Sequence, residues 1–141
     1  MTIEIRLATP DDKDMLVELL EELGYRVSPL YVHDMLSRMR DDNDPVFVAV
    51  AKGAVIGMIA LVITRWIQLE KPIARIPAMI VRSQYQRRGV GRQLIEHAVA
   101  QAHNVGCGTI ELTSANDNTD AHAFYRDMAF EQTSLRFKRI L

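Results

Sequence analysis

Residues 86–92 read QRRGVGR, and they follow the apolar run AMIV at residues 78–81. Gly89 and Gly91 stand where a helical pattern begins, so this loop enters a helix. A helix N-terminus presents backbone amides without partners and about half a positive charge, and glycine lets a ligand approach them closely. Arg87, Arg88 and Arg92 add cationic side chains. The junction therefore predicts a binding site for an anion such as a pyrophosphate.

The spacing of the glycines narrows the choice of anion. A P-loop needs G-x-x-x-x-G-K-[ST], and the stretch GVGRQLIE supplies neither the lysine nor the hydroxyl for magnesium. The dinucleotide fingerprint G-x-G-x-x-G needs a third glycine at position 94, where the chain has Leu94. ATP chemistry of the P-loop class and NAD binding are therefore not expected.

Two motifs resemble those of a known family. The stretch QRRGVG resembles the Q/R-x-x-G-x-G/A signature of the GNAT superfamily of acyl-CoA N-acyltransferases. Further along, NTDAHAFYRDMAFE is similar to a second signature of that family, with Asn118, Ala121, Tyr125 and Phe130 at the matching positions. The opening IRLATPDD also looks like the family's usual first strand and helix start. The resemblance therefore spans essentially the whole chain.

The resemblance implies that acetyl-CoA is the cosubstrate. Its pyrophosphate is expected on the backbone amides of Arg87, Arg88, Gly89, Val90, Gly91 and Arg92. Its pantetheine arm is expected to pair, like an added strand, with Met79, Ile80 and Val81. In the family this strand carries a bulge that splays it from the next strand and directs an amide at the thioester carbonyl, as an oxyanion hole. Asn118 and Tyr125 lie two helical turns apart, so both should face one cofactor.

Acyl transfer to an amine also requires proton transfers. An alkyl ammonium with a pKa near 10.4 is neutral in only about one molecule in 2,500 at pH 7, so a base or a water chain must take its proton. The resemblance implies Tyr125 as the acid that protonates the departing thiolate. Many relatives carry a glutamate at positions that correspond here to Ala78 and Thr113, and neither residue can accept a proton.

Glu111 is the first substitute for that missing base, because its side chain projects to the same side of its strand as Thr113. Glu70 and His122 are weaker candidates, and direct attack through ordered water remains open. The expected catalytic pair is therefore Tyr125 and Glu111.

The periodicity of apolar residues predicts the elements that position these groups. Strands are expected over residues 2–8, 46–51, 54–64, 73–81, 108–116 and 130–141. Helices are expected from residue 10 to Gly24, over 29–40, over 89–106 and over 117–128. In the second helix the inner side is expected to carry Leu30, Met35, Leu36 and Met39. The order βααβββαβαβ describes one mixed α/β sheet flanked by helices, the GNAT fold, in a single domain of residues 1–141.

Composition excludes several function classes. A net charge of -1 gives no global attraction to nucleic acid or to an anionic membrane. The single Cys107 excludes an internal disulfide, and the four histidines show no zinc-ligand spacing with cysteine, so we expect a cytoplasmic protein without a metal. No stretch is long and apolar enough for a leader or a membrane span. A homodimer through the sheet edge and the C-terminal strand is a further expectation.

The sequence thus predicts an N-acetyltransferase that moves the acetyl group of acetyl-CoA directly to a primary amine of a small molecule or peptide. The stretches VITRWIQLEKPI and SLRFKRIL look like the small bacterial aminoalkylphosphonate N-acetyltransferases, which favours a small anionic amine. Two alternatives stay open at this point. One is a non-catalytic acyl-CoA-binding or protein-interaction domain of the same fold, and the other is an unrelated phosphate-binding module.

Overall fold

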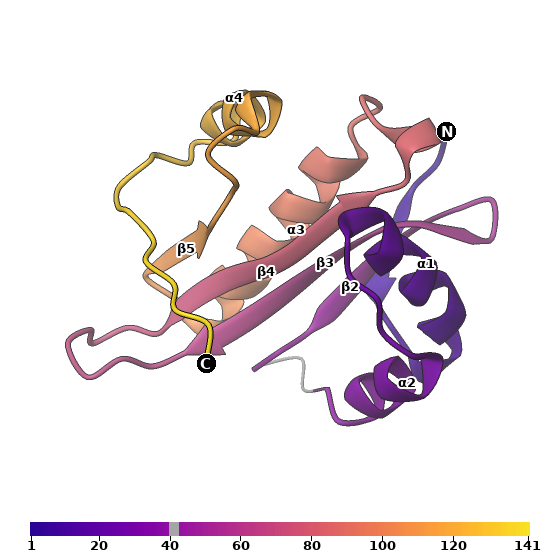
Figure 1. The fold of residues 1–141 in the computed structure, drawn as a ribbon, viewed down its shortest axis with the longest axis horizontal. Coiled ribbons are helices and arrows are strands. Elements are labelled where there is room, and N and C mark those ends of the chain that lie inside the picture. Colours follow the sequence, from indigo (N-terminus) through magenta and orange to yellow (C-terminus); the bar gives the residue numbers. More distant parts are fainter. Residues whose placement is uncertain (40–42) are drawn as a thin grey trace.

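The computed structural model describes residues 1–39 and 43–141, in which five strands form one sheet in the order β1-β2-β3-β4-β5 (Figure 1). Neighbouring strands are antiparallel except β4 and β5, which are parallel. The strands are β1 (Glu4–Leu7), β2 (Val46–Ala51), β3 (Ala54–Thr64), β4 (Ile73–Val81) and β5 (Thr109–Leu112). The helical elements are η1 (Pro10–Asp12), α1 (Lys13–Leu23), α2 (Pro29–Ser37), η2 (Ser83–Tyr85), α3 (Val90–Val105) and α4 (Thr119–Asp127). The predicted mixed α/β sheet is confirmed.

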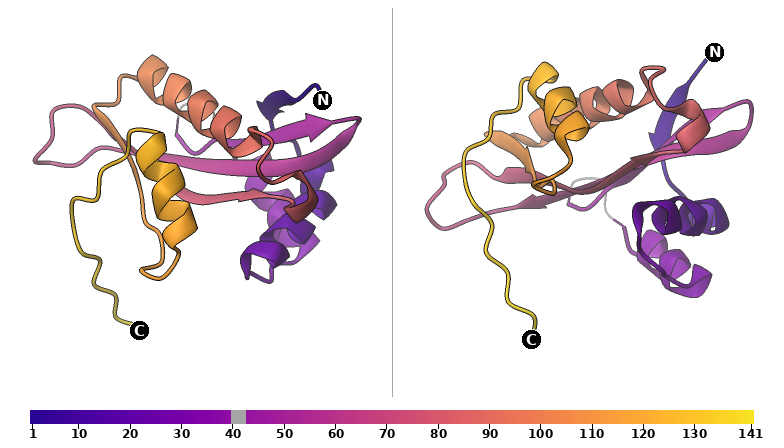
Figure 2. Two further views of the ribbon diagram at one scale, coloured as in Figure 1. Left: turned by 90° about the horizontal axis from the view of Figure 1, so that it is seen from above. Right: turned by 45° about the horizontal axis from the view of Figure 1, so that its top comes forward.

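Helices cover both faces of this sheet (Figure 2). On one face α3 buries Val90, Leu94, Ile95 and Ala98 against β3 and β4, and α4 packs partly buried aromatic side chains at the margin of the same cluster. On the other face Leu16 and Leu19 of α1 and Val32 and Leu36 of α2 pack against β2 and β3. Each face of the sheet therefore has its own apolar cluster, and β3 contributes to both.

The first helix follows the predicted pattern, and the second departs from it. Gly24 ends α1 in the left-handed conformation, at a φ of 105°, as a helix-stopping glycine does. In α2, Val32 and Leu36 are buried, whereas Leu30, expected on the inner side, is 79% exposed. Leu30 lies two residues before Val32, about 200° around the helix, so it faces away from the sheet, and Met35 is likewise 46% exposed. Ser28 caps the helix by accepting a hydrogen bond from the Tyr31 amide at 3.1 Å. The helix ends at Ser37, before its predicted end at residue 40, which lies outside the described residues.

The predicted closing strand is wrong. Residues 130–141 form no strand, and Leu135, Phe137 and Ile140 are 76%, 90% and 86% exposed. Alternating polarity shows which faces a strand would present, but a strand forms only where a neighbouring edge accepts its hydrogen bonds. In this structure the segment runs away from the sheet after α4 (Figure 2).

None of the helices in residues 1–39 and 43–141 is long and apolar enough to cross a membrane.

A buried carboxylate fixes the connection from β1 to α1. Asp12 accepts hydrogen bonds from both terminal nitrogens of Arg6, at 2.8 and 3.0 Å, and from the Thr9 amide at 2.8 Å. Hydrogen bonding from Arg6 is the main reason that the pKa of Asp12 lies below its usual value. This carboxylate therefore joins the first strand to the first helix.

We expect Asp12→Asn to lower the free energy of unfolding by about 1–3 kcal/mol, because the guanidinium of Arg6 loses its charged partner. A urea titration at pH 7 measures this difference. A depressed carboxyl pKa stabilises the fold above the unfolded value of about 3.9, and this contribution disappears as the pH falls through the lower folded value. The gap between the wild type and Asp12→Asn should therefore shrink below about pH 4.

Asp11→Asn is the matched control, because Asp11 lies beside Asp12 in η1 but is exposed. It should change the free energy of unfolding by no more than about 0.5 kcal/mol. Equal losses in the two variants would show that the general negative charge of η1 matters rather than the contact with Arg6.

Candidate active site

β4 separates from β5 halfway along its length. The parallel pairing of the two strands ends at Ile76 and Leu112, while β4 continues beside β3 as far as Val81. The register between β3 and β4 shifts between Ala60, which faces Ala78, and Val62, which faces Arg75. β4 therefore holds one extra residue in this interval, a bulge. A fork opens on the β5 side of residues 77–81.

Pro77 lies within this interval, and the two faces of β4 exchange there. Ala74 and Ile76 pack on the α3 side of the sheet, whereas Ala78 and Ile80 pack on the α1 and α2 side. Proline lacks the amide hydrogen of a regular ladder, so within sheets it is found at edges and bulges. The bulge thus turns Met79 and Val81 to the same face as α3.

The end of β4 is tied down by two side chains to which sequence reasoning gave no role. The Gln86 amide nitrogen donates to the Val81 carbonyl at 3.1 Å. Arg82 donates from Nε to the Val55 carbonyl at 3.0 Å and from a terminal nitrogen to Glu18 of α1 at 2.9 Å. Gln86 is the first residue of the motif QRRGVG, and this position in the motif was the one sequence feature that pointed to Gln86. The loop from β4 to α3 is therefore attached to β4 through Gln86, and to β3 and α1 through Arg82.

The glycine junction adopts the conformation that the sequence required. Gly89 caps α3 at a φ of 84°, and Arg87, two residues earlier, also has a positive φ of 63°. Open space surrounds the position where a Cβ of Gly89 would stand. Left-handed residues flanking Arg88 turn successive amides toward one side of the loop, next to the unpartnered amides of the first turn of α3.

Three guanidinium groups surround this junction. Arg87, Arg88 and Arg92 are exposed, and within the described residues none of them pairs with a carboxylate. Arg88 lies over the ring of Tyr85, with 5.8 Å between the guanidinium carbon and the ring centroid. Unneutralised cations beside a helix N-terminus give the loop a locally positive potential, which suits an anionic ligand.

Two further glycines allow close packing around the fork. A Cβ on Gly57 of β3 would stand 3.1 Å from the Ile80 carbonyl and 3.3 Å from Leu94 of α3, so a larger residue would push these elements apart. A Cβ on Gly91 would stand 3.4 Å from Phe124 of α4 and 4.0 Å from the Met79 side chain. The first turn of α3, the free half of β4 and α4 therefore meet at one place. Sequence reasoning gave no role to Gly57 or Phe124.

Tyr125 follows Phe124 on α4 and is partly buried. Its ring contacts Phe124 at a centroid distance of 5.5 Å and Phe130 at 6.0 Å. Burial raises the pKa of the Tyr125 phenol above its usual value. Among the described residues no group forms a hydrogen bond with its hydroxyl. The side chain is thus a protonated phenol at neutral pH whose polar group is free to contact a ligand.

Asn118 and His122 have structural contacts at the start of α4. The Asn118 side-chain oxygen accepts a hydrogen bond from the Ala121 amide at 3.3 Å, so Asn118 caps the helix. A ring nitrogen of His122 lies 2.8 Å from the Ala115 carbonyl and must donate there, since a carbonyl only accepts. The side-chain nitrogen of Asn118 takes no part in this cap. Asn118 can therefore cap and bind a ligand at once.

The carboxylate candidates lie apart from Tyr125. Ile110 and Leu112 pack on the α3 side, so Glu111 between them faces the opposite side of β5, where it forms an ion pair with Arg75 of β4. Glu70 lies in the connection before β4, at the other end of that strand from the glycine loop. Tyr125 thus lies on the α3 side of the sheet and Glu111 on the other, one residue before the fork opens.

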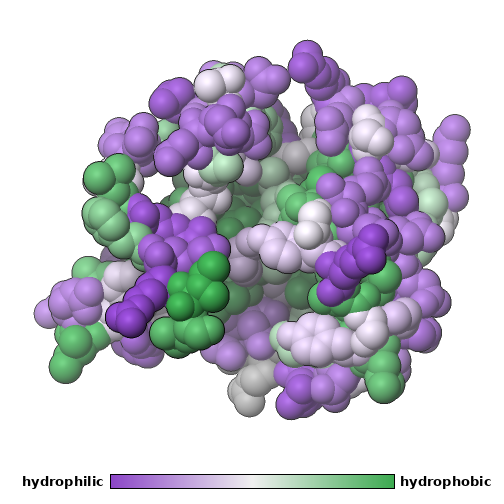
Figure 3. Space-filling model, in the orientation of Figure 1, coloured by the Kyte–Doolittle hydropathy of each residue, from purple (hydrophilic) through white to green (hydrophobic). Residues whose placement is uncertain are grey.

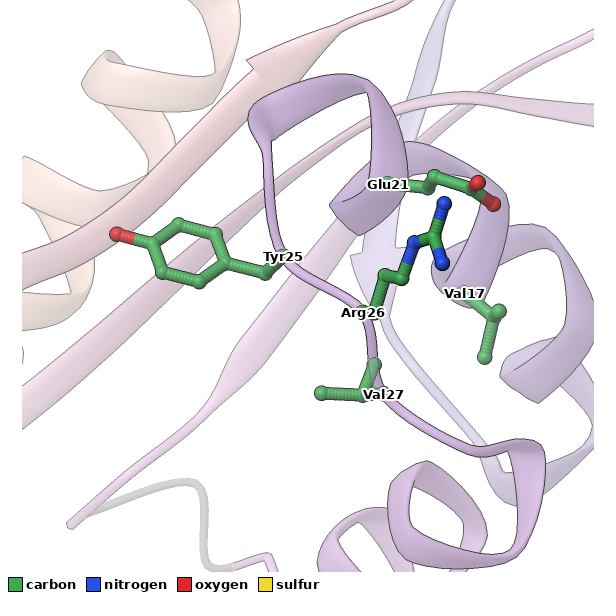
Figure 4. A pocket seen from close by; sticks show the side chains of 5 residues that line it. All are labelled: Val17, Glu21, Tyr25, Arg26 and Val27. Carbon is green, nitrogen blue, oxygen red and sulfur yellow. The ribbon is translucent and has the colours of Figure 1, made fainter.

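A cavity of about 380 Å³ opens on the α1 and α2 side of the sheet. It is lined by Val17, Glu21, Tyr25, Arg26 and Val27, from α1 and the connection to α2. In Figure 4 the guanidinium of Arg26 points toward the carboxylate of Glu21, while the Tyr25 ring points in the opposite direction. None of the predicted site residues lines this cavity. It is separate from the glycine junction.

Comparison with known proteins gives consistent matches. The model of the acetyltransferase (GNAT) family matches residues 13–130. The aminoalkylphosphonate N-acetyltransferase of Salmonella typhimurium is 29% identical over 143 residues, which cover 98% of this chain and 91% of that protein.

Two solved structures share the fold. A transcriptional regulator from Bacillus halodurans C-125 superposes with a TM-score of 0.88 at 22% identity, covering 99% of this chain and 100% of that one. An acetyltransferase from Trypanosoma brucei gives a TM-score of 0.85 at 20% identity, with the same coverage of 99% and 100%. At these identities the two structures support the fold alone.

We expect Tyr125 to ionise above the ordinary phenol pKa of about 10, because the charged form is poorly solvated at its site. Nuclear magnetic resonance of protein labelled at the tyrosine Cζ measures this pKa, and Tyr125→Phe assigns the resonance. A raised phenol pKa stabilises the fold below the unfolded value of about 10, and the contribution is lost as the pH rises through the folded value.

Tyr25→Phe is the control for assignment, because Tyr25 is 62% exposed and distant from α4 in sequence. It should leave the Tyr125 resonance and its titration unchanged. A Tyr125 pKa at or below about 10 would contradict the buried placement of the phenol.

Proposed function

The chain belongs to the acetyltransferase (GNAT) family, and we propose that it transfers the acetyl group of acetyl-CoA directly to a primary amine of a small molecule. The fork in the sheet carries this proposal. Among the described strands none pairs with the β5-facing edge of β4 beyond Ile76, and β4 leads into the left-handed loop at Gly89 that opens α3. An extended arm with an anionic group at one end fits an open strand edge that ends at a cationic helix N-terminus.

In this proposal the backbone binds most of the cosubstrate. The amides of residues 87–92 hold the pyrophosphate, and Arg87, Arg88 and Arg92, which have no carboxylate partners in the described chain, add positive charge. The free edge of β4 at Met79, Ile80 and Val81 pairs with the pantetheine arm. Asn118 and Tyr125 contact the same ligand from α4. The rigid attachment of the loop through Gln86 and Arg82 keeps these amides in place before binding.

Acetyl-CoA supplies an activated acyl thioester, and the chain must manage charge and protons during transfer. An amide of the bulged part of β4 stabilises negative charge on the thioester oxygen, a contribution on the order of 3 kcal/mol for such a donor. Tyr125 donates its proton to the departing thiolate sulfur and regains one from solvent. A phenol is protonated at neutral pH, so Tyr125 has a proton to donate there, and burial raises its pKa further. The carbon–sulfur bond breaks as the carbon–nitrogen bond forms.

The amine proton leaves on the opposite side of the sheet. We assign Glu111 as the base that accepts the amine proton. Glu111 faces the α1 and α2 side of the sheet next to the fork. A water molecule carries the proton where the amine and the carboxylate are not in contact. The ion pair with Arg75 holds the Glu111 carboxylate at this place on the sheet. The two proton transfers are then separated by the sheet, and the fork is where acid, base and acyl group come within reach.

The acceptor in this proposal is a small amine that carries an anionic group, such as an aminoalkylphosphonate. The relative that acts on aminoalkylphosphonates matches nearly the whole length of this chain, which supports testing that class first. Amines without the anionic group, and peptides with a free N-terminus, are the comparison substrates.

We expect the wild type to bind acetyl-CoA selectively in a calorimetric titration, with ATP and NAD as controls, and Gly89→Ala to weaken that binding about tenfold or more. An alanine is strained at a φ of 84° and distorts the loop, although its Cβ meets open space. Gly53→Ala is the matched control, because Gly53 also has a positive φ, 76°, and open space but lies in the turn between β2 and β3.

The two alanine variants should lose similar free energy of unfolding, about 1 kcal/mol each, while Gly53→Ala keeps its affinity for acetyl-CoA within about twofold. Equal affinity in both variants would remove the glycine loop from the binding site. Binding of ATP in place of acetyl-CoA would indicate an unrelated phosphate-binding module.

We expect Tyr125→Phe to lower turnover about tenfold or more while acetyl-CoA affinity stays within about threefold, because the ring remains and the proton donor is lost. Release of free thiol with a 1-aminoalkylphosphonate as acceptor measures turnover. Unchanged turnover would remove Tyr125 as the acid. Tight acetyl-CoA binding without thiol release for any amine would favour the non-catalytic acyl-CoA-binding domain.

A further inference from the structure

Arg75 and Glu111 form an ion pair on an open part of the α1 and α2 side of the sheet. The two residues stand opposite each other in the parallel pairing of β4 and β5, one position before that pairing ends. Their side chains are 38% and 40% exposed, so both charged groups reach solvent. Of the described residues of β4, only Ala78 and Ile80 join the apolar cluster beneath α1 and α2, and both come after the bulge. The two helices therefore leave this ion pair uncovered.

The surface beside the ion pair has room for a small ligand. Ala60 of β3 and Ala78 of β4 face each other on one side of the bulge, and Val62 pairs with Arg75 on the other side of it. The two alanines have short side chains and are only partly buried. In Figure 3 the front of the molecule is recessed at its centre, between the part that carries α1 and α2 and the part that carries α4. A small ligand at the ion pair can thus reach the fork.

The ion pair offers one charge of each sign within one strand spacing, about 4.8 Å. A guanidinium group pairs with two oxygens of a phosphonate or a carboxylate, and a carboxylate accepts hydrogen bonds from an ammonium group. Exposed ion pairs contribute little to stability because solvent screens them, so this pair can open for a ligand. A molecule with both charges on the same or adjacent carbons replaces one internal contact with two.

A ligand with a single charge gains much less at this ion pair. An anion that binds Arg75 leaves the Glu111 carboxylate without its cation. An amine that binds Glu111 leaves the Arg75 guanidinium without its anion. Charges that a wrong ligand leaves unpaired are a source of discrimination. The ion pair therefore favours a zwitterion over either charge by itself.

Three other arginines in this part of the molecule are placed less favourably. Arg26 lines the cavity between α1 and its connection to α2. Arg65 follows the end of β3, away from the fork. Arg82 follows the end of β4 and is held by a β3 carbonyl and by α1. Among these four cations, Arg75 is the one that stands next to the bulge.

We propose that Arg75 and Glu111 recognise the acceptor together, with Arg75 binding its anionic group and Glu111 its ammonium group. Arg75 is then the residue that selects amines carrying a phosphonate or carboxylate on the same or an adjacent carbon. Binding at Glu111 also places the amine beside the carboxylate that takes its proton. This inference rests on the proposed transfer to a small anionic amine, but the binding can be measured without turnover.

The first experiment compares four probes in calorimetric titrations of the full chain, with and without saturating coenzyme A. Two probes are zwitterions, 1-aminoethylphosphonate and the amino acid alanine, and two carry a single charge, ethylphosphonate and ethylamine. The wild type should bind at least one zwitterion about tenfold or more tightly than either single-charge probe. The difference between the two zwitterions tells which anionic group Arg75 accepts.

Substitution of either partner should affect the probes in opposite directions. Arg75→Gln should weaken binding of the preferred zwitterion about tenfold or more, while ethylamine binds at least as tightly as to the wild type because Glu111 is released. By the same reasoning Glu111→Gln should keep or strengthen the binding of ethylphosphonate. Arg75→Lys should recover part of the zwitterion affinity, since it keeps the charge without the guanidinium fork. A purely structural loss would weaken all four probes together.

Arg65→Gln is the matched control, because it removes the same charge from an exposed arginine near the other end of the connection between β3 and β4. It should leave the affinity for each probe within about twofold. Arg26→Gln tests the cavity beside α1 and should likewise leave the preference for zwitterions unchanged.

Several results would overturn the proposal. They are a wild type without preference for a zwitterion, including one that binds no probe, equal losses for all four probes in Arg75→Gln, and a loss in Arg65→Gln or Arg26→Gln as large as in Arg75→Gln. Acetyl-CoA binding and thiol release are measured separately. Zwitterion binding through Arg75 without thiol release for any amine would overturn the transferase instead, whereas thiol release without zwitterion preference would overturn only the role of this ion pair.

Discussion

The bulge in β4 is the constraint on which the rest of the site depends. Up to Ile76 the strand pairs with β3 on one side and β5 on the other, and beyond it only the β3 pairing continues. One extra residue is enough to exchange the faces of the strand, because side chains alternate with a period of two. The same residue therefore opens an unpaired strand edge and turns Met79 toward α3 and α4. A regular strand at this position would have closed the sheet and left no place for an extended ligand.

An open strand edge in the middle of a sheet must be supported by other contacts. Gly57 lets β3 approach the Ile80 carbonyl, and Arg82 ties the end of β4 to the Val55 carbonyl and to α1. Gln86 holds the following loop against Val81. These contacts come from elements on both faces of the sheet, so the loop amides are oriented before a ligand arrives. Such preorganisation lowers the entropy that binding would otherwise cost.

The sheet also separates the two groups to which we assign the proton transfers. Tyr125 lies among aromatic rings on the α3 side, where burial raises the pKa of its phenol, and Glu111 lies on the other side in an ion pair. The fork joins the two faces, which is why we propose that the reaction takes place there.

Much of the fold and of the loop followed from the sequence, because the signals were local. Gly24 and Gly89 stand where the backbone needs a positive φ, and the apolar spacing of α1 and α3 matches their buried faces. The family resemblance added the bulge, which composition alone does not indicate. Local patterns were enough wherever the chain conformation depended on a residue and its near neighbours.

Tertiary structure decided what depends on distant partners. The exposure of Leu30 followed from which face of α2 packs on the sheet, the face of Val32 and Leu36, and residues 130–141 leave α4 after the contact between Phe130 and Tyr125. The roles of Gly57, Gln86 and Arg82 each depend on a backbone carbonyl, which no side-chain pattern reveals. By itself the sequence determined most of the elements and the glycine loop that opens α3. Only packing decided which edge stays open and which face each ionisable group occupies, because these depend on contacts between residues far apart in the chain.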